Sequence, residues 1–286
     1  MNKTTLLKKL IGDKEILLVP GAYNALSAKM IEHVGFKAVY MTGYGTSAAN
    51  FGSPDLGLLT MTEMVENASR IADSVAIPVI ADADTGYGNP LNVSRAVKMY
   101  EKAGVAAIHI EDQLWPKRCG HMSGKKTIPL EDMVEKLKAA VDSRQDKDFL
   151  IIARTDAIAT EGFNAAINRA RMYSDAGADV LFVEAPTSIE QVKAIPKLIP
   201  EKPHLINMAP LTPNLPAKEL EELGFSLAIY PGICLAATIS SCLQVLEKLN
   251  NTGSQGNLEE WINSFADLNN FLGLSGYLEM QDKYKS

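Results

Sequence analysis

Carboxylates recur at short spacing in the first half of the chain. Asp82 and Asp84 lie two positions apart at the end of an apolar run, and Glu111 closes another such run. Residues two apart on a strand point the same way. Carboxylates are hard oxygen donors, and the sequence places no histidine cluster or cysteine pair beside them. The pattern therefore favours Mg²⁺, with Mn²⁺ as a possible substitute, over zinc as a ligand of Asp82, Asp84 and Glu111.

A cysteine with cationic neighbours lies in the segment Lys117-Arg118-Cys119-Gly120-His121. Such neighbours are expected to lower the pKa of the Cys119 thiol and to favour the thiolate, which suits a nucleophile or a proton donor. This segment belongs to a loop of residues 115–129, and its Gly120 and Gly124 indicate that the loop is a mobile lid that could exclude water from a site. The plainer alternative is a surface loop that carries an incidental cysteine.

Eight short apolar runs alternate with longer segments of helical period, which predicts βα units and a parallel sheet. The predicted strands are 16–19, 38–41, 78–83, 106–110, 149–153, 180–183, 204–206 and 226–229. The predicted helices are 24–33, 62–74, 91–103, 130–143, 164–176, 189–197, 217–223 and 236–249. Eight units predict an α/β fold of the (β/α)8 TIM barrel type. A doubly wound open sheet is the alternative, but no Gly-x-Gly-x-x-Gly segment opens a helix after the first strand.

The predicted barrel forms a catalytic domain of residues 1–252, and a C-terminal helical tail of residues 253–286 follows it. Residues 257–274 have the pattern of an amphipathic helix. Its apolar face holds Trp261, Phe265, Leu268 and Phe271. A helix of this kind must pack somewhere, either on its own barrel or on a neighbouring subunit.

Polar residues gather at the predicted carboxyl ends of the strands, where TIM-barrel enzymes carry their active sites. Any one of them could be a solvated loop residue or a helix cap. Their convergence on one rim instead predicts a binding site. Arg154 stands out among them, because its guanidinium fork matches a substrate carboxylate.

The composition narrows the class of protein further. The chain has 286 residues and a net charge of -6, from 28 Lys plus Arg and 34 Asp plus Glu, which argues against non-specific binding of nucleic acid. Three cysteines form no disulfide framework and suit a reducing cytoplasm. The sequence also lacks a signal peptide and an apolar run near the roughly 20 residues that span a bilayer.

The motifs resemble those of the isocitrate lyase/phosphoenolpyruvate mutase superfamily. KRCGH at 117–121 follows DADTGYG at 82–88 and HIEDQ at 109–113, and ARTDA at 153–157 comes later. The similarity runs from PGAYNALSAKMIE at 20–32 to YPG at 230–232. The short chain is similar to the branch of methylisocitrate lyase, 2,3-dimethylmalate lyase and oxaloacetate hydrolase. Cys119 favours carbon–carbon cleavage, since the phosphonate-making mutases lack this residue.

The resemblance implies roles for the site residues. Asp84 would bind magnesium directly, with Asp82 and Glu111 partly bound through water. Cys119 would be the general acid, with Lys117, Arg118 and His121 tuning the lid. The implied substrate-binding residues are Tyr40, Thr42, Gly43, Tyr44, Asp55, Gly120, Arg154, Glu184 and Asn207. The resemblance also implies a homotetramer in which C-terminal helices swap between subunits.

The implied reaction is the magnesium-dependent cleavage of a 2-hydroxy di- or tricarboxylate to pyruvate, or a related keto acid, and a carboxylic acid. The base is open between a carboxylate and Tyr40. After Asn207, the segment Met208-Ala209-Pro210-Leu211-Thr212-Pro213 lacks a glutamate that several methylisocitrate lyases carry. The segment predicts a smaller or more apolar pocket, which suits 2,3-dimethylmalate or another C4–C6 hydroxy diacid. The alternatives are 2-methylisocitrate lyase, oxaloacetate hydrolase, a phosphonate enzyme and a non-catalytic binding barrel.

Overall fold

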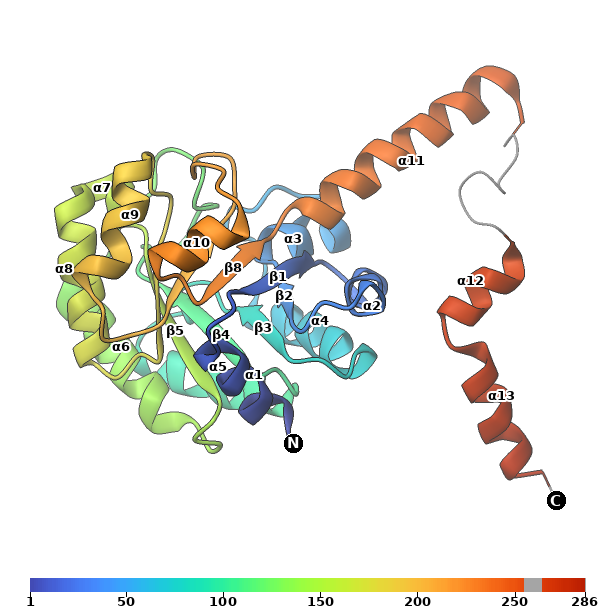
Figure 1. Cartoon of the computed structure of the whole chain (residues 1–286), viewed down its shortest axis with the longest axis horizontal. Coiled ribbons are helices and arrows are strands. Elements are labelled where there is room, and N and C mark those ends of the chain that lie inside the picture. The colour runs from blue at the N-terminus through green and yellow to red at the C-terminus, as the bar shows by residue number, and fades with distance from the viewer. Residues whose placement is uncertain (255–263, 286) are drawn as a thin grey trace. The chain divides into compact units, whose positions relative to one another are not determined.

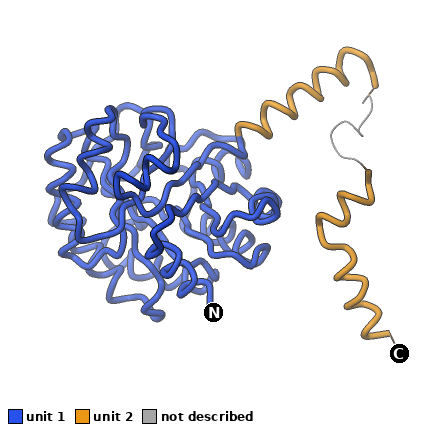
Figure 2. The backbone as a smooth tube through the Cα atoms, viewed as in Figure 1, with its two compact units in different colours: residues 1–235 blue, residues 236–286 orange. Residues whose placement is uncertain are grey.

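The computed structural model describes residues 1–254 and 264–285. The chain divides into two compact units, Met1–Leu235 and Ala236–Ser286 (Figure 2). The sequence places the domain boundary at residues 252 and 253, inside the second unit, and that boundary stays a prediction. Among the described residues, no helix has the length and apolarity needed to cross a membrane.

The first unit is a closed barrel of eight parallel strands, joined in chain order (Figure 1). The strands are β1 (Leu17–Ala22), β2 (Val39–Met41), β3 (Val79–Asp82), β4 (Ala107–Glu111), β5 (Leu150–Thr155), β6 (Val180–Val183), β7 (His204–Asn207) and β8 (Leu227–Tyr230). Pairing of β8 with β1, which sets Leu17 opposite Leu227, closes the barrel. The predicted (β/α)8 TIM barrel is therefore confirmed.

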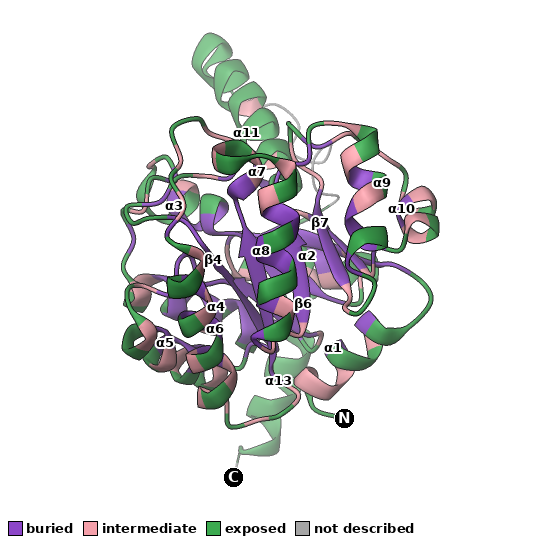
Figure 3. Cartoon of the chain, turned by 90° about the vertical axis from the view of Figure 1, so that its left-hand side faces the viewer, coloured by how far each residue is buried: buried purple, intermediate pink, exposed green. Residues whose placement is uncertain are grey.

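Helices surround and cover the strands, and the faces of the helices that point away from the strands are exposed (Figure 3). They are α2 (Ala25–Val34), α4 (Met61–Ser74), α5 (Pro90–Lys102), α6 (Leu130–Ser143), α8 (Phe163–Asp175), α9 (Ile189–Leu198) and α10 (Ala217–Leu223). The long α11 (Ile233–Thr252) begins in the first unit and continues into the second. Each corresponds to a predicted helix. The strands are covered on both faces, which explains why they are apolar almost throughout.

Three helices of the first unit were not predicted: α1 (Lys3–Gly12), α3 (Gly43–Phe51) and α7 (Ala157–Glu161). The α3 sequence GYGTSAANF contains two glycines and little apolar periodicity, so it resembles a loop. The Thr42 side chain starts this helix by accepting a hydrogen bond from the Gly45 amide at 3.2 Å. Gly52 ends it in the left-handed conformation, with φ of 61°.

Two apolar layers form the core, one inside the barrel and one between the strands and the outer helices. The inner layer contains Leu7 and Ile11 of α1 together with strand residues such as Ile80 and Leu227. Helix α1 therefore closes the amino-terminal end of the barrel. Lys3 anchors this helix by donating to the carbonyls of residues 72 and 75.

The second unit contains most of α11 and two further helices, α12 (Phe265–Phe271) and α13 (Leu274–Lys283). In its described part the predicted helix 257–274 corresponds to α12 but ends earlier than expected, at Phe271, because Gly273, with φ of 85°, separates α12 from α13. Trp261 and the rest of residues 257–263 lie outside the described residues. Neither α12 nor α13 buries a described residue. Their exposed apolar side chains include Phe265, Tyr277, Leu278 and Met280.

Candidate active site

Polar side chains fill the carboxyl end of the barrel interior. They alternate in step with the apolar residues inside the barrel: Asp82 lies two positions after Ile80, and Arg154 lies two positions after Ile152. The strands therefore aim both side chains along the barrel axis. The buried polar residues on these strands or directly after them include Asp82, Asp84, His109, Glu111, Arg154, Asp156, Glu184 and Asn207.

A hydrogen-bonded group surrounds Asp82. Its carboxylate accepts from the amide of Gly43 at 3.2 Å and from the amide of Asp84 at 2.9 Å. His109 Nε2 lies 3.4 Å from Asp82 Oδ1 and 2.7 Å from the hydroxyl of Tyr40. Burial lowers the pKa of His109 to about 4, so this imidazole is neutral at pH 7. His109 was not predicted as a site residue, although its position two before Glu111 aims it into the same interior.

Lys117 joins the lid to two carboxylates. Its Nζ lies 2.7 Å from Asp55 Oδ1 and 2.7 Å from Asp84 Oδ1. All three side chains are buried. Burial raises the pKa of Asp84 to about 7, even though Lys117 acts in the opposite direction.

Arg154 is held by carboxylates on both sides. Its Nε lies 2.9 Å from Asp156 Oδ2 and 3.2 Å from Glu111 Oε2. The guanidinium also stacks over Phe182, 5.1 Å from the ring centre. Asp156 carries a second cation, Lys125 Nζ of the lid, at 2.8 Å.

Asp156 and Lys125 were not assigned roles from the sequence. Asp156 had a signal in the segment ARTDA directly after β5, whereas Lys125 had none. Burial works to raise the pKa of Asp156, but Arg154 and Lys125 outweigh it and hold the pKa below its ordinary 3.8.

His121 attaches the lid to the opposite side of the mouth. Its Nε2 lies 2.7 Å from Glu184 Oε1, and its Nδ1 accepts from the Leu211 amide at 3.2 Å. The Leu211 bond leaves the proton on Nε2, which then donates to Glu184. Asn207 donates to the same Glu184 oxygen at 3.1 Å. The structure thus brings together three residues that the sequence had selected separately.

Cys119 corrects one expectation. Burial raises the pKa of its thiol above the ordinary 9.0, where cationic neighbours had been expected to lower it. The neighbours act elsewhere, because Lys117 is taken up by carboxylates and exposed Arg118 donates to the carbonyl of Ser123 at 3.0 Å. A thiol that keeps its proton at neutral pH suits a proton donor rather than a nucleophile.

Other predicted residues differ in how they reach this cluster. Gly43 and Gly120 provide close backbone approach, since a Cβ on Gly43 would collide with the Asp82 carboxylate and one on Gly120 with Arg154 and Glu184. Thr42 is buried as the cap of α3. Tyr44 and Arg118 are exposed, and the structure does not bring either side chain into the cluster.

The carboxylate cluster fits a hard divalent cation. Glu111 Oε1 is buried and accepts no hydrogen bond from any described residue, and the Lys117 ammonium lies 2.7 Å from Asp84 Oδ1. Within the described chain, no three His, Cys, Asp or Glu side chains converge closely enough to enclose an ion alone. An ion held there would keep several waters, as Mg²⁺ commonly does.

Two cavities adjoin the barrel mouth. One of about 360 Å³ is lined by lid residues, among them Trp115, Lys117 and Arg118. The other, of about 310 Å³, lies on the loop after β7 and is lined by Met208, Ala209, Pro210, Thr212, Asn214 and Tyr230. This second lining combines the apolar Met208, Ala209 and Pro210 with the polar, uncharged Thr212, Asn214 and Tyr230.

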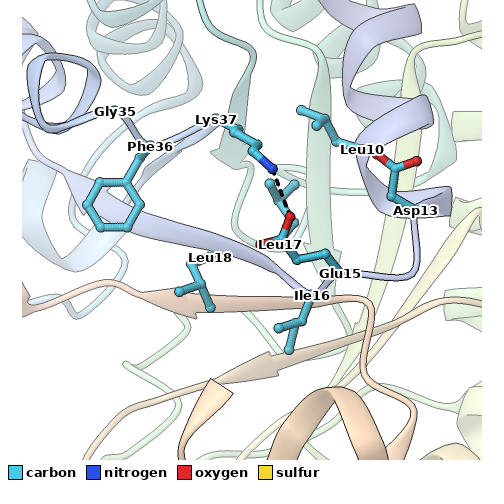
Figure 4. Close-up of a pocket in the computed structure, with 9 residues that line it drawn as sticks. All are labelled: Leu10, Asp13, Glu15, Ile16, Leu17, Leu18, Gly35, Phe36 and Lys37. Carbon is cyan, nitrogen blue, oxygen red and sulfur yellow. Dashed lines mark hydrogen bonds and ion pairs between the residues drawn. The ribbon is translucent and has the colours of Figure 1, made fainter. Parts of the chain in front are cut away.

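A third pocket lies at the amino-terminal ends of β1 and β2, on the far side of the barrel from the lid (Figure 4). It measures about 150 Å³. Its charged contact is the exposed pair of Lys37 and Glu15, 2.9 Å apart. Exposed pairs of this kind contribute little, so we place no site there.

The chain is similar in sequence to proteins of known function. A family model described as phosphoenolpyruvate phosphomutase matches residues 7–250. The chain is 44% identical to 2,3-dimethylmalate lyase of Eubacterium barkeri over 286 residues, which cover 99% of each chain. It is 38% identical to 2-methylisocitrate lyase of Shewanella oneidensis, with 96% of this chain and 95% of the relative covered.

Solved structures agree with these relatives. A crystal structure of 2,3-dimethylmalate lyase, a PEP mutase/isocitrate lyase superfamily member, matches with a TM-score of 0.94 and 38% identity, covering 99% of this chain and 95% of that one. The structure of oxaloacetate acetylhydrolase bound to 3,3-difluorooxalacetate matches with a TM-score of 0.94 and 36% identity, covering 99% of this chain and 97% of that one. The structure of phosphonopyruvate hydrolase bound to oxalate and Mg²⁺ matches with a TM-score of 0.91 and 28% identity, covering 99% of both chains.

Proposed function

The chain belongs to the PEP mutase/isocitrate lyase superfamily, and on this premise we propose that it is a magnesium-dependent carbon–carbon lyase acting on 2,3-dimethylmalate. The observation that carries the proposal is Cys119, a half-buried thiol of raised pKa on a lid attached to the carboxylate cluster. This arrangement provides a proton donor above a site that binds anions and a cation.

The carboxylates Asp84, Asp82 and Glu111 would hold the ion. When bound, Mg²⁺ supplies Lewis acidity to the substrate's hydroxyl and neighbouring carboxylate. A buried carboxylate of the cluster takes the hydroxyl proton. Tyr40 is the poorer base, because burial raises the pKa of its phenol well above 10.0 and keeps it protonated.

Bond cleavage follows from the position of the charges. As the C2–C3 bond breaks, its electron pair moves to the departing carbon, which becomes the enolate form of the product acid. Arg154 stabilises negative charge on the substrate carboxylate. Cys119 then gives its proton to that carbon. Glu184 and Asn207 hold His121, and the closed lid excludes water that would otherwise protonate the carbon.

The loop after β7 supports the choice of substrate. Met208, Ala209 and Pro210 line the cavity there beside uncharged polar residues, and no cationic side chain is part of the lining. Such a lining suits the methyl groups of dimethylmalate better than an additional carboxylate, which would need a positive partner. The 44% identity to a 2,3-dimethylmalate lyase points the same way. 2-Methylisocitrate is the second candidate, since a relative with that activity is 38% identical.

The test is a lyase assay that reports keto acid through a coupled dehydrogenase. We expect turnover of 2,3-dimethylmalate to exceed that of 2-methylisocitrate, with both dependent on added Mg²⁺. Higher turnover of 2-methylisocitrate would reverse the assignment of the substrate. Oxaloacetate and phosphonopyruvate complete the panel, and turnover of phosphonopyruvate alone would contradict the lyase.

We expect the enzyme to work as a homotetramer in the reducing cytoplasm, where Cys119 stays a thiol. The described helices of the second unit support an oligomer, because their apolar side chains are exposed in the single chain.

A further inference from the structure

The ammonium of Lys117 contacts two carboxylates at the predicted metal site. Lys117 Nζ lies 2.7 Å from both Asp55 Oδ1 and Asp84 Oδ1, and the Lys117 side chain is 3% exposed. Solvent therefore screens these charges very little. Removing any one of the three charges should change how strongly the other two attract a further ion.

Lys117 has more contacts with Asp55 than with Asp84. Its Nζ lies 2.7 Å from Oδ1 and 2.8 Å from Oδ2 of Asp55, so it contacts both oxygens of that carboxylate. It contacts Asp84 through Oδ1, at 2.7 Å. A cation can take the Asp84 oxygen while Lys117 keeps its bond to Asp55.

Asp55 is also the support of the general acid. Its backbone carbonyl accepts a hydrogen bond from the Cys119 amide at 3.2 Å, two residues beyond Lys117. Its carboxylate and its carbonyl therefore hold the lid at two points. A change in the Lys117 contact acts on the segment that carries the thiol.

We propose that Lys117 is a positioning residue that competes with the divalent cation for Asp84 and, when displaced, remains on Asp55 and keeps Cys119 in place. This inference rests on the proposed function, since it takes Asp84 as a ligand of the ion. It assigns to one lysine both the metal affinity of the site and the docking of the lid.

The test is the affinity of the full-length chain for Mn²⁺, measured without substrate by the electron paramagnetic resonance signal of free Mn²⁺. Lys117→Met, which keeps the aliphatic stem and removes the charge, should bind Mn²⁺ at least about tenfold more tightly than the wild type. Lys117→Arg should bind as the wild type does. Lys126→Met, an exposed position on the same lid, is the matched control and should not change the affinity.

The outcomes separate the two claims. Equal or weaker Mn²⁺ binding by Lys117→Met overturns the competition but leaves the lyase standing. Absence of Mn²⁺ binding in every variant overturns the metal dependence and the competition with it. Lys117→Gln provides a second neutral variant if Lys117→Met does not fold, and the same tightening is expected there.

Lid docking has its own readout in Trp115, whose ring lies 6.4 Å from that of Tyr87. In a Trp261→Phe background Trp115 is the single tryptophan, because the chain has two. Because Lys117 stays on Asp55 when the ion binds, adding Mg²⁺ should leave the emission of this background unchanged. Lys117→Met removes the contacts with Asp55 and should shift the emission even without Mg²⁺. Equal emission with and without Lys117→Met would overturn the docking role of Lys117.

Discussion

Cys119 shows how burial, rather than neighbouring sequence, sets the chemistry of a side chain. Its neighbours in the chain are a lysine and an arginine, and from sequence alone they predict a thiolate. The structure turns both cations away from the thiol, and desolvation raises the pKa. Sequence can place a residue in a loop, but it does not show which carboxylates will take up the adjacent charges.

Replacing the thiol tests its role directly. Cys119→Ala should lower kcat on the preferred substrate by about 10²–10⁴-fold, the usual contribution of a general acid. Binding of Mg²⁺ and pyruvate should persist, because the thiol ligates neither in this assignment. Isothermal calorimetry measures the binding, and the coupled assay measures kcat. Turnover near that of the wild type would remove Cys119 from the mechanism.

The raised pKa also predicts a pH profile. A general acid works only while protonated, so activity is present below the pKa of the folded-state thiol and is lost as pH rises through it. That pKa lies above the ordinary 9.0, so the alkaline limb assigned to Cys119 should fall above pH 9. At pH 8, iodoacetamide should modify Cys119 more slowly in the folded protein than in the urea-unfolded chain, as peptide mapping would show. Faster modification of Cys119 would indicate a thiolate.

Gly43 illustrates a constraint that only the packing reveals. An added Cβ would overlap the Asp82 carboxylate, so Gly43→Ala should cost about 1–3 kcal/mol in the free energy of unfolding and weaken Mg²⁺ binding. Gly12→Ala is the control, since nothing lies within 4 Å of its added Cβ. Urea titration compares the two variants, and equal stability would show that the mouth tolerates the methyl group.

At the scale of elements, the strands and outer helices were predictable because each has a strong apolar period. The unpredicted helices α3 and α7 lack such a period. Helix α3 depends on a cap and two glycines, and α7 has five residues, too few for a period to show. Contacts between loops were equally hidden, which is why Lys125 of the lid was missed as the partner of Asp156.

Helix α1 makes a prediction of its own at this scale. Leu7 is fully buried in the inner apolar layer, so Leu7→Ala should lower the free energy of unfolding by about 2–5 kcal/mol. Lys9→Ala, exposed on the same helix, should stay within about 0.5 kcal/mol of the wild type. Chemical denaturation followed by circular dichroism gives both values. A small loss for Leu7→Ala would mean that α1 docks loosely.

At the scale of the whole molecule, eight regular units made the barrel predictable, whereas the end of the chain follows no such repeat. The described helices of the second unit have apolar side chains without an internal core, so no pattern within one chain fixes their packing. In the proposed homotetramer their surroundings would depend on other copies, and a sequence taken alone carries little information about those.

The oligomer can be tested through these side chains. Leu243 and Leu246 of α11 are 53% and 59% exposed in the single chain. If they pack between subunits, Leu243→Glu with Leu246→Glu should reduce the mass measured by light scattering from that of a tetramer to that of a smaller species. The barrel should stay folded, as judged by circular dichroism. An unchanged mass would show that assembly uses another surface.

The sealed floor of the barrel has a consequence for the order of events in turnover. With α1 across one end, reactant and both products must share the mouth that the lid covers. The shallower product lies between the deeper one and this opening, so we expect the shallower product to leave first. Ordered release has a kinetic signature: the product that leaves last inhibits competitively with the substrate, and the other does not.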